Sequence, residues 1–304
     1  MDSGSKLEYK QNINLMANKD YKKRLIRRRI NLAIRYTILT FVAFIMLYPI
    51  LWLIGASFKS NSEIFSSIGF IPSKLDFTPY VKGWETGTQY TFATYFLNTF
   101  KIVIPKVIVT VISVVITAYG FARFNFPGKK IFFAILIATL FLPQIVTRIP
   151  MYLFWNKLGM LDKFTPLVVP SAFAVDAFFV FMLIQFMRGI PRELDEAATI
   201  DGCGPFRILI DIIIPILKPA IISVALFQFM WSMNDFMGPL IYISSVEKYP
   251  VSIALKMAMD TTSGTFDWNQ IIAMSIIALI PSIALFLSAQ KYFVEGISTS
   301  GIKG

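Results

Sequence analysis

The chain of 304 residues places a few polar side chains inside long apolar runs, where their chemistry needs an explanation. Asp176 lies in the middle of the run 164–187, and an ionised carboxylate facing lipid there would cost several kcal/mol. Trp231, Asn234 and Asp235 interrupt a second run. Together the four side chains offer hydrogen-bond acceptors, a donor and a stacking surface, a combination that suits recognition of hydroxyl groups along a substrate path.

Two other interpretations of these polar groups remain open. They could hold helices together, by pairing with Lys101 or Lys106 or with backbone groups near Gly238-Pro239. Alternatively, Asp176 and Asp235 could carry an ion or a proton in a secondary transporter. The chain has no His and one Cys, so we expect neither a zinc site nor His-based acid–base catalysis.

The elements that must position these groups follow from composition. With 56% hydrophobic residues, a mean hydropathy of +0.63 and 29 Phe, the sequence is typical of a polytopic membrane protein. A helix of about 20 residues crosses a hydrocarbon core of about 30 Å. We therefore predict an all-α membrane protein with six transmembrane helices, over residues 36–58, 94–122, 131–149, 164–187, 219–243 and 268–289.

The basic residues predict the topology. Ten of the 29 Lys and Arg precede Tyr36, and the net charge is +11. Positive-inside placement explains this cluster better than a nucleic-acid partner does, so we expect both termini in the cytoplasm. The expected parts are a basic cytoplasmic segment 1–35, a six-span transmembrane domain 36–289 with a cytoplasmic loop 188–218, and a cytoplasmic tail 290–304.

The loop 188–218 is a polar island between two apolar runs. Pro191 suits a first helical position, and acidic residues follow it near the positive end of the helix dipole. Gly202 is expected to end this helix, and Gly204-Pro205 to begin another. Ala197 and Ala198 would let a partner approach closely beside the Glu196 carboxylate, as in helix-in-groove docking. The alternative is an amphipathic helix resting on the bilayer surface.

The loop carries a spaced motif: Glu-Ala-Ala, three residues, Gly, nine residues, and then Ile-x-Ile-Pro, formed by Glu196, Ala197, Ala198, Gly202, Ile212, Ile214 and Pro215. It resembles the signature of the membrane permease subunits of ATP-driven (ABC) importers, with Ile214 in place of a Leu. The resemblance implies a type I ABC importer permease fold, in which this loop is a coupling helix that sits in a groove of a cytoplasmic ATPase. The residues it assigns to coupling are Glu196, Ala197, Ala198, Asp201, Gly202 and Pro215.

The end of the chain, 290–304, is similar to that of carbohydrate-uptake permeases, in particular the smaller, MalG-like subunit. Trp231, Asn234, Asp235 and Phe236 before Pro239-Leu240 approximate another motif of this branch. The resemblance implies a sugar or oligosaccharide as substrate and a bacterial cell membrane location. The implied partners are a second homologous permease, two cytoplasmic ATPase subunits and an extracellular or periplasmic sugar-binding protein.

The chain has no Gly-x-x-x-x-Gly-Lys-Ser/Thr phosphate loop, so ATP and Mg would be bound by the partner ATPase. We therefore expect no enzymatic activity and no cofactor in this chain itself. The outer loop 244–267 is expected to meet the binding protein through small polar residues, namely Thr261, Thr262, Ser263, Gly264 and Thr265; a plain solvated connection is the alternative. A permease for amino acids or peptides, and an ion-coupled secondary transporter, remain the alternative functions.

Overall fold

The computed structural model describes residues 3–85, 89–259 and 267–300, and the regular elements in these ranges are helices. The chain divides into two compact units, residues 1–75 and 76–304. The predicted contact residues Thr261 to Thr265 lie outside the described residues, as does the end of the predicted tail, 301–304.

The first unit consists of α1 (Ser3–Ala56), a short helix α2 (Asn61–Ser66) and the loop that follows. The helix α1 runs without interruption across the predicted boundary at residue 35, and its part Ile26–Ala56 is long and apolar enough to cross a membrane. The Ser60 hydroxyl caps α2 by accepting a hydrogen bond from the Glu63 N–H at 3.3 Å.

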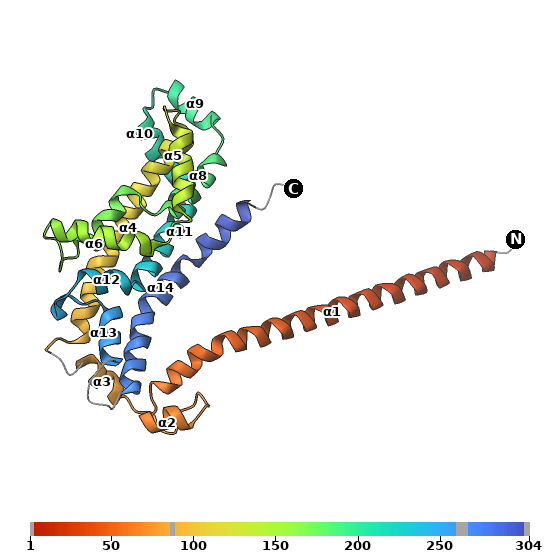
Figure 1. Ribbon diagram of the computed structural model, residues 1–304. Helices are drawn as coiled ribbons and strands as arrows, with labels where there is room; N and C mark the ends of the chain where they lie inside the picture. The colour runs from red at the N-terminus through yellow and green to blue at the C-terminus, as the bar shows by residue number, and fades with distance from the viewer. Residues whose placement is uncertain (1–2, 86–88, 260–266, 301–304) are drawn as a thin grey trace. The chain divides into compact units, whose positions relative to one another are not determined.

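In the second unit, α4 (Phe92–Arg123) lies against α8 (Ala177–Arg188) and α11 (Ile214–Met233), and α11 also packs on α14 (Trp268–Ser300) (Figure 1). Branched and small side chains form the shared core, since these shapes let helices approach closely. Its fully buried members include Val114, Ala118, Leu183, Ile213 and Val224.

Five helical segments of the described residues are long and apolar enough to span a membrane: Ile26–Ala56, Phe92–Arg123, Thr165–Arg188, Pro205–Met233 and Trp268–Lys291. They correspond to five of the six predicted spans. The all-helical membrane fold is therefore confirmed. The fifth span begins earlier than predicted, because helix already starts at Pro205 and continues through a π-helical turn, Leu209–Ile213, into α11.

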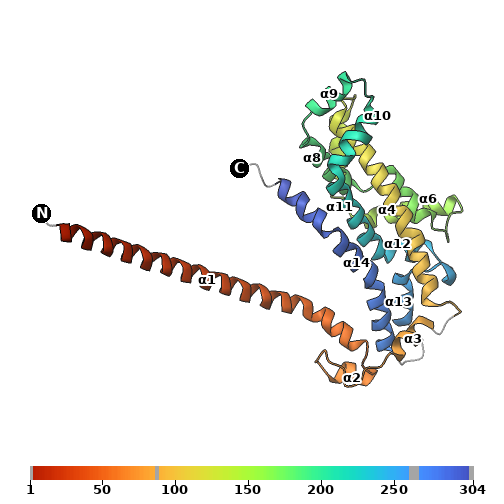
Figure 2. The ribbon, with the colours of Figure 1, turned by 180° about the vertical axis from the view of Figure 1, so that it is seen from behind.

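The predicted third span, 131–149, is not one continuous helix. It is divided into α5 (Lys129–Thr139) and α6 (Gln144–Lys157), and both views show α6 extending to the side of the bundle (Figures 1 and 2). Pro143 explains the break, because it has no N–H to donate and disfavours helical geometry in the preceding residue. An 11-residue helix is about 16 Å long, half of a hydrocarbon core. The count of six spans is thus not confirmed.

Two further helices, α9 (Glu193–Ile200) and α10 (Pro205–Ile208), lie at one end of the second unit. At the opposite end lie α3 (Thr78–Glu85) and α13 (Val251–Met259) (Figures 1 and 2). Short elements complete the unit: α7 (Thr165–Val168), the 3-10 helix η1 (Val169–Phe173), α12 (Met237–Tyr242) and the 3-10 helix η3 (Val246–Lys248). Beyond residue 289, where a tail was predicted, α14 continues to Ser300.

Candidate functional site

The predicted docking loop, residues 188–218, forms a helix, a tight turn and a second helix. Asp201 is the C-cap residue of α9, and Gly202 follows it with φ +82°. The Gly202 N–H donates to the Thr199 carbonyl at 3.0 Å, and the Cys203 N–H donates to the Ala198 carbonyl at 2.9 Å. These two bonds form a Schellman motif, which needs a left-handed residue at Gly202.

The start of each helix is also set by local sequence. Gly204 is extended, with φ −74° and ψ 161°, and Pro205 takes the first position of α10, as predicted. Pro191, in contrast, is not a first helical residue, because α9 begins at Glu193 with Arg192 as its cap. The acidic residues of the first turn still lie at the positive end of the helix dipole.

An ion pair fastens α9 to the end of α4. Arg123 Nε lies 2.8 Å from Asp195 Oδ2, and only 6% and 19% of these side chains are exposed. An Arg123 Nη2 group also donates to the Ile190 carbonyl at 3.2 Å. The sequence placed Asp195 only among the acidic residues at the start of the predicted helix and did not indicate that it pairs with Arg123. The sequence offered one indication of this ion pair: Arg123 directly follows the predicted span 94–122, and the loop 188–218 carries several acidic residues.

Two more bonds complete this attachment. Arg192 Nη2 donates to the Ala122 carbonyl at 3.3 Å, and the Tyr119 hydroxyl donates to the Pro205 carbonyl at 3.0 Å. Both ends of the turn are therefore bonded to α4, which is one of the helices long and apolar enough to span a membrane.

The two alanines of the motif have different environments. Ala198 is buried in the bundle core, whereas Glu196 and Ala197 are exposed. Only Ala197 can therefore provide the close approach that we predicted for both alanines. Two apolar side chains that sequence reasoning did not single out stand out from the loop: Ile200 is 87% exposed and Phe206 is 70% exposed. The motif's last residue, Pro215, is exposed in the first turn of α11.

The predicted path residues cluster in part. Trp231 is half exposed, and its ring stacks on Phe179 with 4.8 Å between ring centroids; Phe178 is also adjacent, at 5.8 Å. Asp176 lies just before these phenylalanines, at the break between η1 and α8, rather than in the middle of a continuous helix. Ala174, with φ +52°, forms that break. A carboxylate and an aromatic surface thus lie close along the chain at the break.

Asn234 and Asp235 have structural roles in this conformation. The Asn234 side-chain amide donates to the Met230 carbonyl at 2.8 Å, at the end of its own helix. Asp235 Oδ1 accepts from the Gly238 N–H at 2.9 Å, and Lys106 Nζ lies 4.0 Å from its other oxygen. The alternative in which these groups hold helices together therefore describes Asp235 better.

A small polar cavity adjoins the same pair. Its volume of about 10 Å³ has room for about one water molecule and not for a sugar. Lys106, Asp235, Ser232 and Ser252 are among its lining residues. In the described residues no group of three or more His, Cys, Asp or Glu side chains comes together as a metal site.

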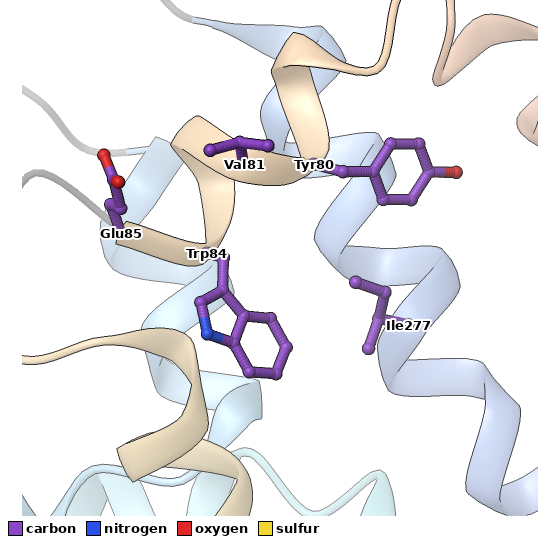
Figure 3. A pocket seen from close by; sticks show the side chains of 5 residues that line it. All are labelled: Tyr80, Val81, Trp84, Glu85 and Ile277. Carbon is purple, nitrogen blue, oxygen red and sulfur yellow. The ribbon is translucent and has the colours of Figure 1, made fainter.

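A larger cavity of about 380 Å³ lies between α3 and α14 (Figure 3). It is lined by Tyr80, Val81, Trp84, Glu85 and Ile277, and the Glu85 carboxylate points away from the space between Trp84 and Ile277. The walls are almost wholly apolar, so the cavity has few groups that could recognise sugar hydroxyls.

The segment before α7 is joined to the segment after α12 by Asp162, an acidic residue that the sequence analysis did not single out. Asp162 has φ +57°, and its carboxylate accepts bonds from the Ser244 and Ser245 N–H groups, the Ser245 hydroxyl and Lys248 Nζ, at 2.6–3.1 Å. Desolvation would raise the pKa of Asp162, but the bonds from Lys248 and Ser245 outweigh it and hold this pKa well below its usual range.

The comparisons with known proteins agree with this architecture. Residues 110–299 match the family model described as the binding-protein-dependent transport system inner membrane component. The chain is 29% identical to the arabinooligosaccharides transport system permease protein AraQ of Halalkalibacterium halodurans, over 87% of this chain and 94% of that protein. It is also 29% identical to the galactooligosaccharides transport system permease protein GanQ of Bacillus subtilis, over 92% of this chain and 98% of that protein.

A solved structure has the same fold. It is a chain of a bacterial ABC transporter involved in the import of the acidic polysaccharide alginate, with a TM-score of 0.75 and 24% identity, and the match covers 87% of this chain and 97% of that one. The matched family model covers more than half of the sequence and includes the whole docking loop. The chain therefore belongs to the family of inner membrane components of binding-protein-dependent transport systems, as an ABC permease subunit rather than an ATPase.

Proposed function

We propose that the chain is one permease of an ATP-driven importer for a neutral sugar or oligosaccharide. The observation that carries this proposal is similarity along almost the whole chain to two permeases named for oligosaccharide transport. Substrate specificity is not a property of the fold alone, so the proposal rests on those two permeases and not on the fold shared with the alginate transporter.

The proposed coupling element is the docking loop 188–218. Its exposed side chains Glu196, Ala197, Ile200 and Phe206 would enter a groove of the partner ATPase, with the apolar pair supplying most of the binding energy. Asp201 and Gly202 would hold the end of α9, and Pro215 would direct the chain into α11. The four contacts with α4 would carry the motion of the ATPase into the membrane.

The proposed topology places the α9 end and both termini in the cytoplasm. The basic cluster before Tyr36 supports this orientation. A sixth crossing would be made by α5 and α6 together, with the break at 140–143 protected by other protein, because broken helices at membrane depth need such protection. A second homologous permease is the proposed source of that protection and of the other half of the path.

The proposed path passes the break at Asp176 and the aromatic surface of Trp231, which could stack on a sugar ring. An extracellular binding protein would deliver the substrate at the α3 and α13 end, and residues 261–265 remain our proposed contact. Asn98 supports that end from α4: its amide donates to the Glu247 and Tyr249 carbonyls at 2.7 and 3.2 Å.

The test is a reconstituted complex of the permeases, the ATPase and the binding protein, in which oligosaccharides are screened for stimulation of ATP hydrolysis. Stimulation by a sugar supports the proposal. Stimulation only by amino acids or peptides would assign the subunit to another substrate class. Uptake that continues without ATP would instead support an ion-coupled carrier, with Asp176 as its proton or ion group.

A further inference from the structure

The segment Ser60–Ile71, here named the return loop, leaves α1 at its carboxyl end and carries unusually exposed apolar side chains. Ile68 and Ile71 are 86% and 73% exposed. Apolar side chains exposed so fully in one short loop indicate a surface that is covered in the working protein. The loop belongs to neither the docking loop nor the proposed path.

The return loop folds back along α1 instead of extending away from it. The Tyr48 hydroxyl, on α1, donates to the Ile68 carbonyl at 3.0 Å. The Phe70 backbone touches α1 at Gly55, where an added Cβ atom would clash with the Phe70 carbonyl oxygen. The loop therefore lies beside the last turns of α1, where it contacts Tyr48 and Gly55.

The position of these contacts along α1 defines a depth. Counted from Tyr36, the first residue after the basic cluster, a hydrocarbon core of about 30 Å takes about 20 residues of helix and ends near Gly55. Tyr48 lies seven residues earlier, which is about 10 Å deeper along the helix. The Ile68 backbone is thus at the level of the lipid leaflet, and not in the water beyond it.

The backbone of the loop is prepared for such surroundings. Three consecutive carbonyls, of Ser67, Ile68 and Gly69, accept hydrogen bonds from protein side chains. Tyr48 bonds the middle one, and Lys59 Nζ bonds the other two. Lys59 is only 1% exposed, so these bonds replace water as its partners. Carbonyls must be satisfied internally where water is scarce, whereas a solvated loop has no such need.

We propose that the return loop is a membrane-embedded anchor whose side chains Ile68 and Ile71 insert into the lipid leaflet at the carboxyl end of α1. Lys74, exposed three residues after Ile71, is placed to reach lipid phosphates at the surface. The anchor would set the height of the first span in the bilayer. This inference rests on membrane insertion of α1 and not on the proposed substrate.

The experiment labels a single cysteine at Ile68 with an environment-sensitive fluorophore, in the full chain carrying Cys203→Ser and reconstituted in nanodiscs. Quenching by lipids with a doxyl group on the acyl chain is compared with quenching by iodide in the water. A label at Glu193, exposed on α9, is the aqueous control. We expect doxyl quenching at position 68 to be several-fold stronger than at position 193, and iodide quenching several-fold weaker.

A second variant tests the hydrogen bond. Tyr48→Phe should raise iodide quenching at position 68, because the fraction of molecules in which the return loop is detached from α1 should rise about fivefold. This factor corresponds to the loss of one hydrogen bond of about 1 kcal/mol. Tyr36→Phe is the matched control, since it removes the same hydroxyl from an exposed tyrosine of α1 that makes no hydrogen bond in the described part of the chain.

Two results would overturn the proposal. Iodide quenching at position 68 equal to that at position 193 would place the loop in water. Protection from both quenchers would show that protein, such as the second permease, covers it instead of lipid. Because neither result depends on transport, both are distinguishable from a failure of the proposed sugar import.

Discussion

Replacing Gly202 by alanine should weaken the proposed contact between this subunit and its partner ATPase. Gly202 has φ +82°, and an added Cβ would meet no atom within 4 Å, so the penalty comes from the backbone alone. A left-handed conformation costs a residue with a Cβ about 1–2 kcal/mol. The population of the closed turn should therefore fall by a factor of about 5–30. The exposed edge of α9, from Glu196 to Ile200, would then fray.

Gly204→Ala is the matched control, because Gly204 lies two residues away, is equally open, and has the ordinary φ of −74°. The assay is substrate-stimulated ATPase activity of the reconstituted complex, together with the amount of ATPase that copurifies. We expect Gly202→Ala to lower both and Gly204→Ala to change neither. Equal effects of the two substitutions would refute the role of the left-handed turn.

Three further predictions follow from individual contacts. Arg123→Met leaves the buried Asp195 carboxylate without its partner and should destabilise the subunit by about 3 kcal/mol. Arg207→Met is the control and should change the stability little, because the side chains of the Arg207–Asp211 ion pair are 73% and 57% exposed. Equal shifts in Tm for the two substitutions would contradict this prediction. The pKa of Asp162 is lowered in the folded chain, so its carboxylate stabilises the fold at neutral pH and loses this effect as the pH falls through the lowered pKa. The Tm difference between wild type and Asp162→Asn should therefore be present at neutral pH and vanish in acid. A Tm difference that grows in acid would contradict this prediction. Trp231→Ala should change which sugars stimulate ATPase activity while the complex stays assembled; loss of assembly without a change in preference would instead show that the stack on Phe179 is structural.

Several features of the chain depend on short-range chemistry and were predictable from sequence. Gly202 ends α9 because a glycine can adopt a positive φ without a steric penalty, and Pro205 begins α10 because its missing N–H is not needed there. Long apolar runs predicted five of the spans, since the hydrocarbon thickness sets the length of a helix that crosses it. The spacing of the docking motif likewise indicated the family, which the matched model bears out.

The third span shows where composition alone misleads. The run 131–149 is mostly apolar, with Thr139, Gln144, Thr147 and Arg148 as its polar residues, so its hydropathy indicated a single helix. A local steric effect at Pro143 divides it into α5 and α6. The proline was visible in the sequence, but prolines also lie inside α4 and α11 without ending them. Surrounding helices decide which prolines are tolerated, because they determine whether the freed carbonyls find other partners.

Only the tertiary structure shows which side chains attach the docking loop to α4. Nothing in the spacing indicates that Arg123 pairs with Asp195, because 71 residues separate them and only the packing of α4 against the loop brings them within 2.8 Å. The same packing buries Ala198 and exposes Ala197, although the two are chemically identical neighbours. Sequence determines which residues can make a turn or cross a membrane, since those properties depend on a few consecutive residues. Which charges meet and which faces are covered depends on distant segments, and therefore on the folded chain.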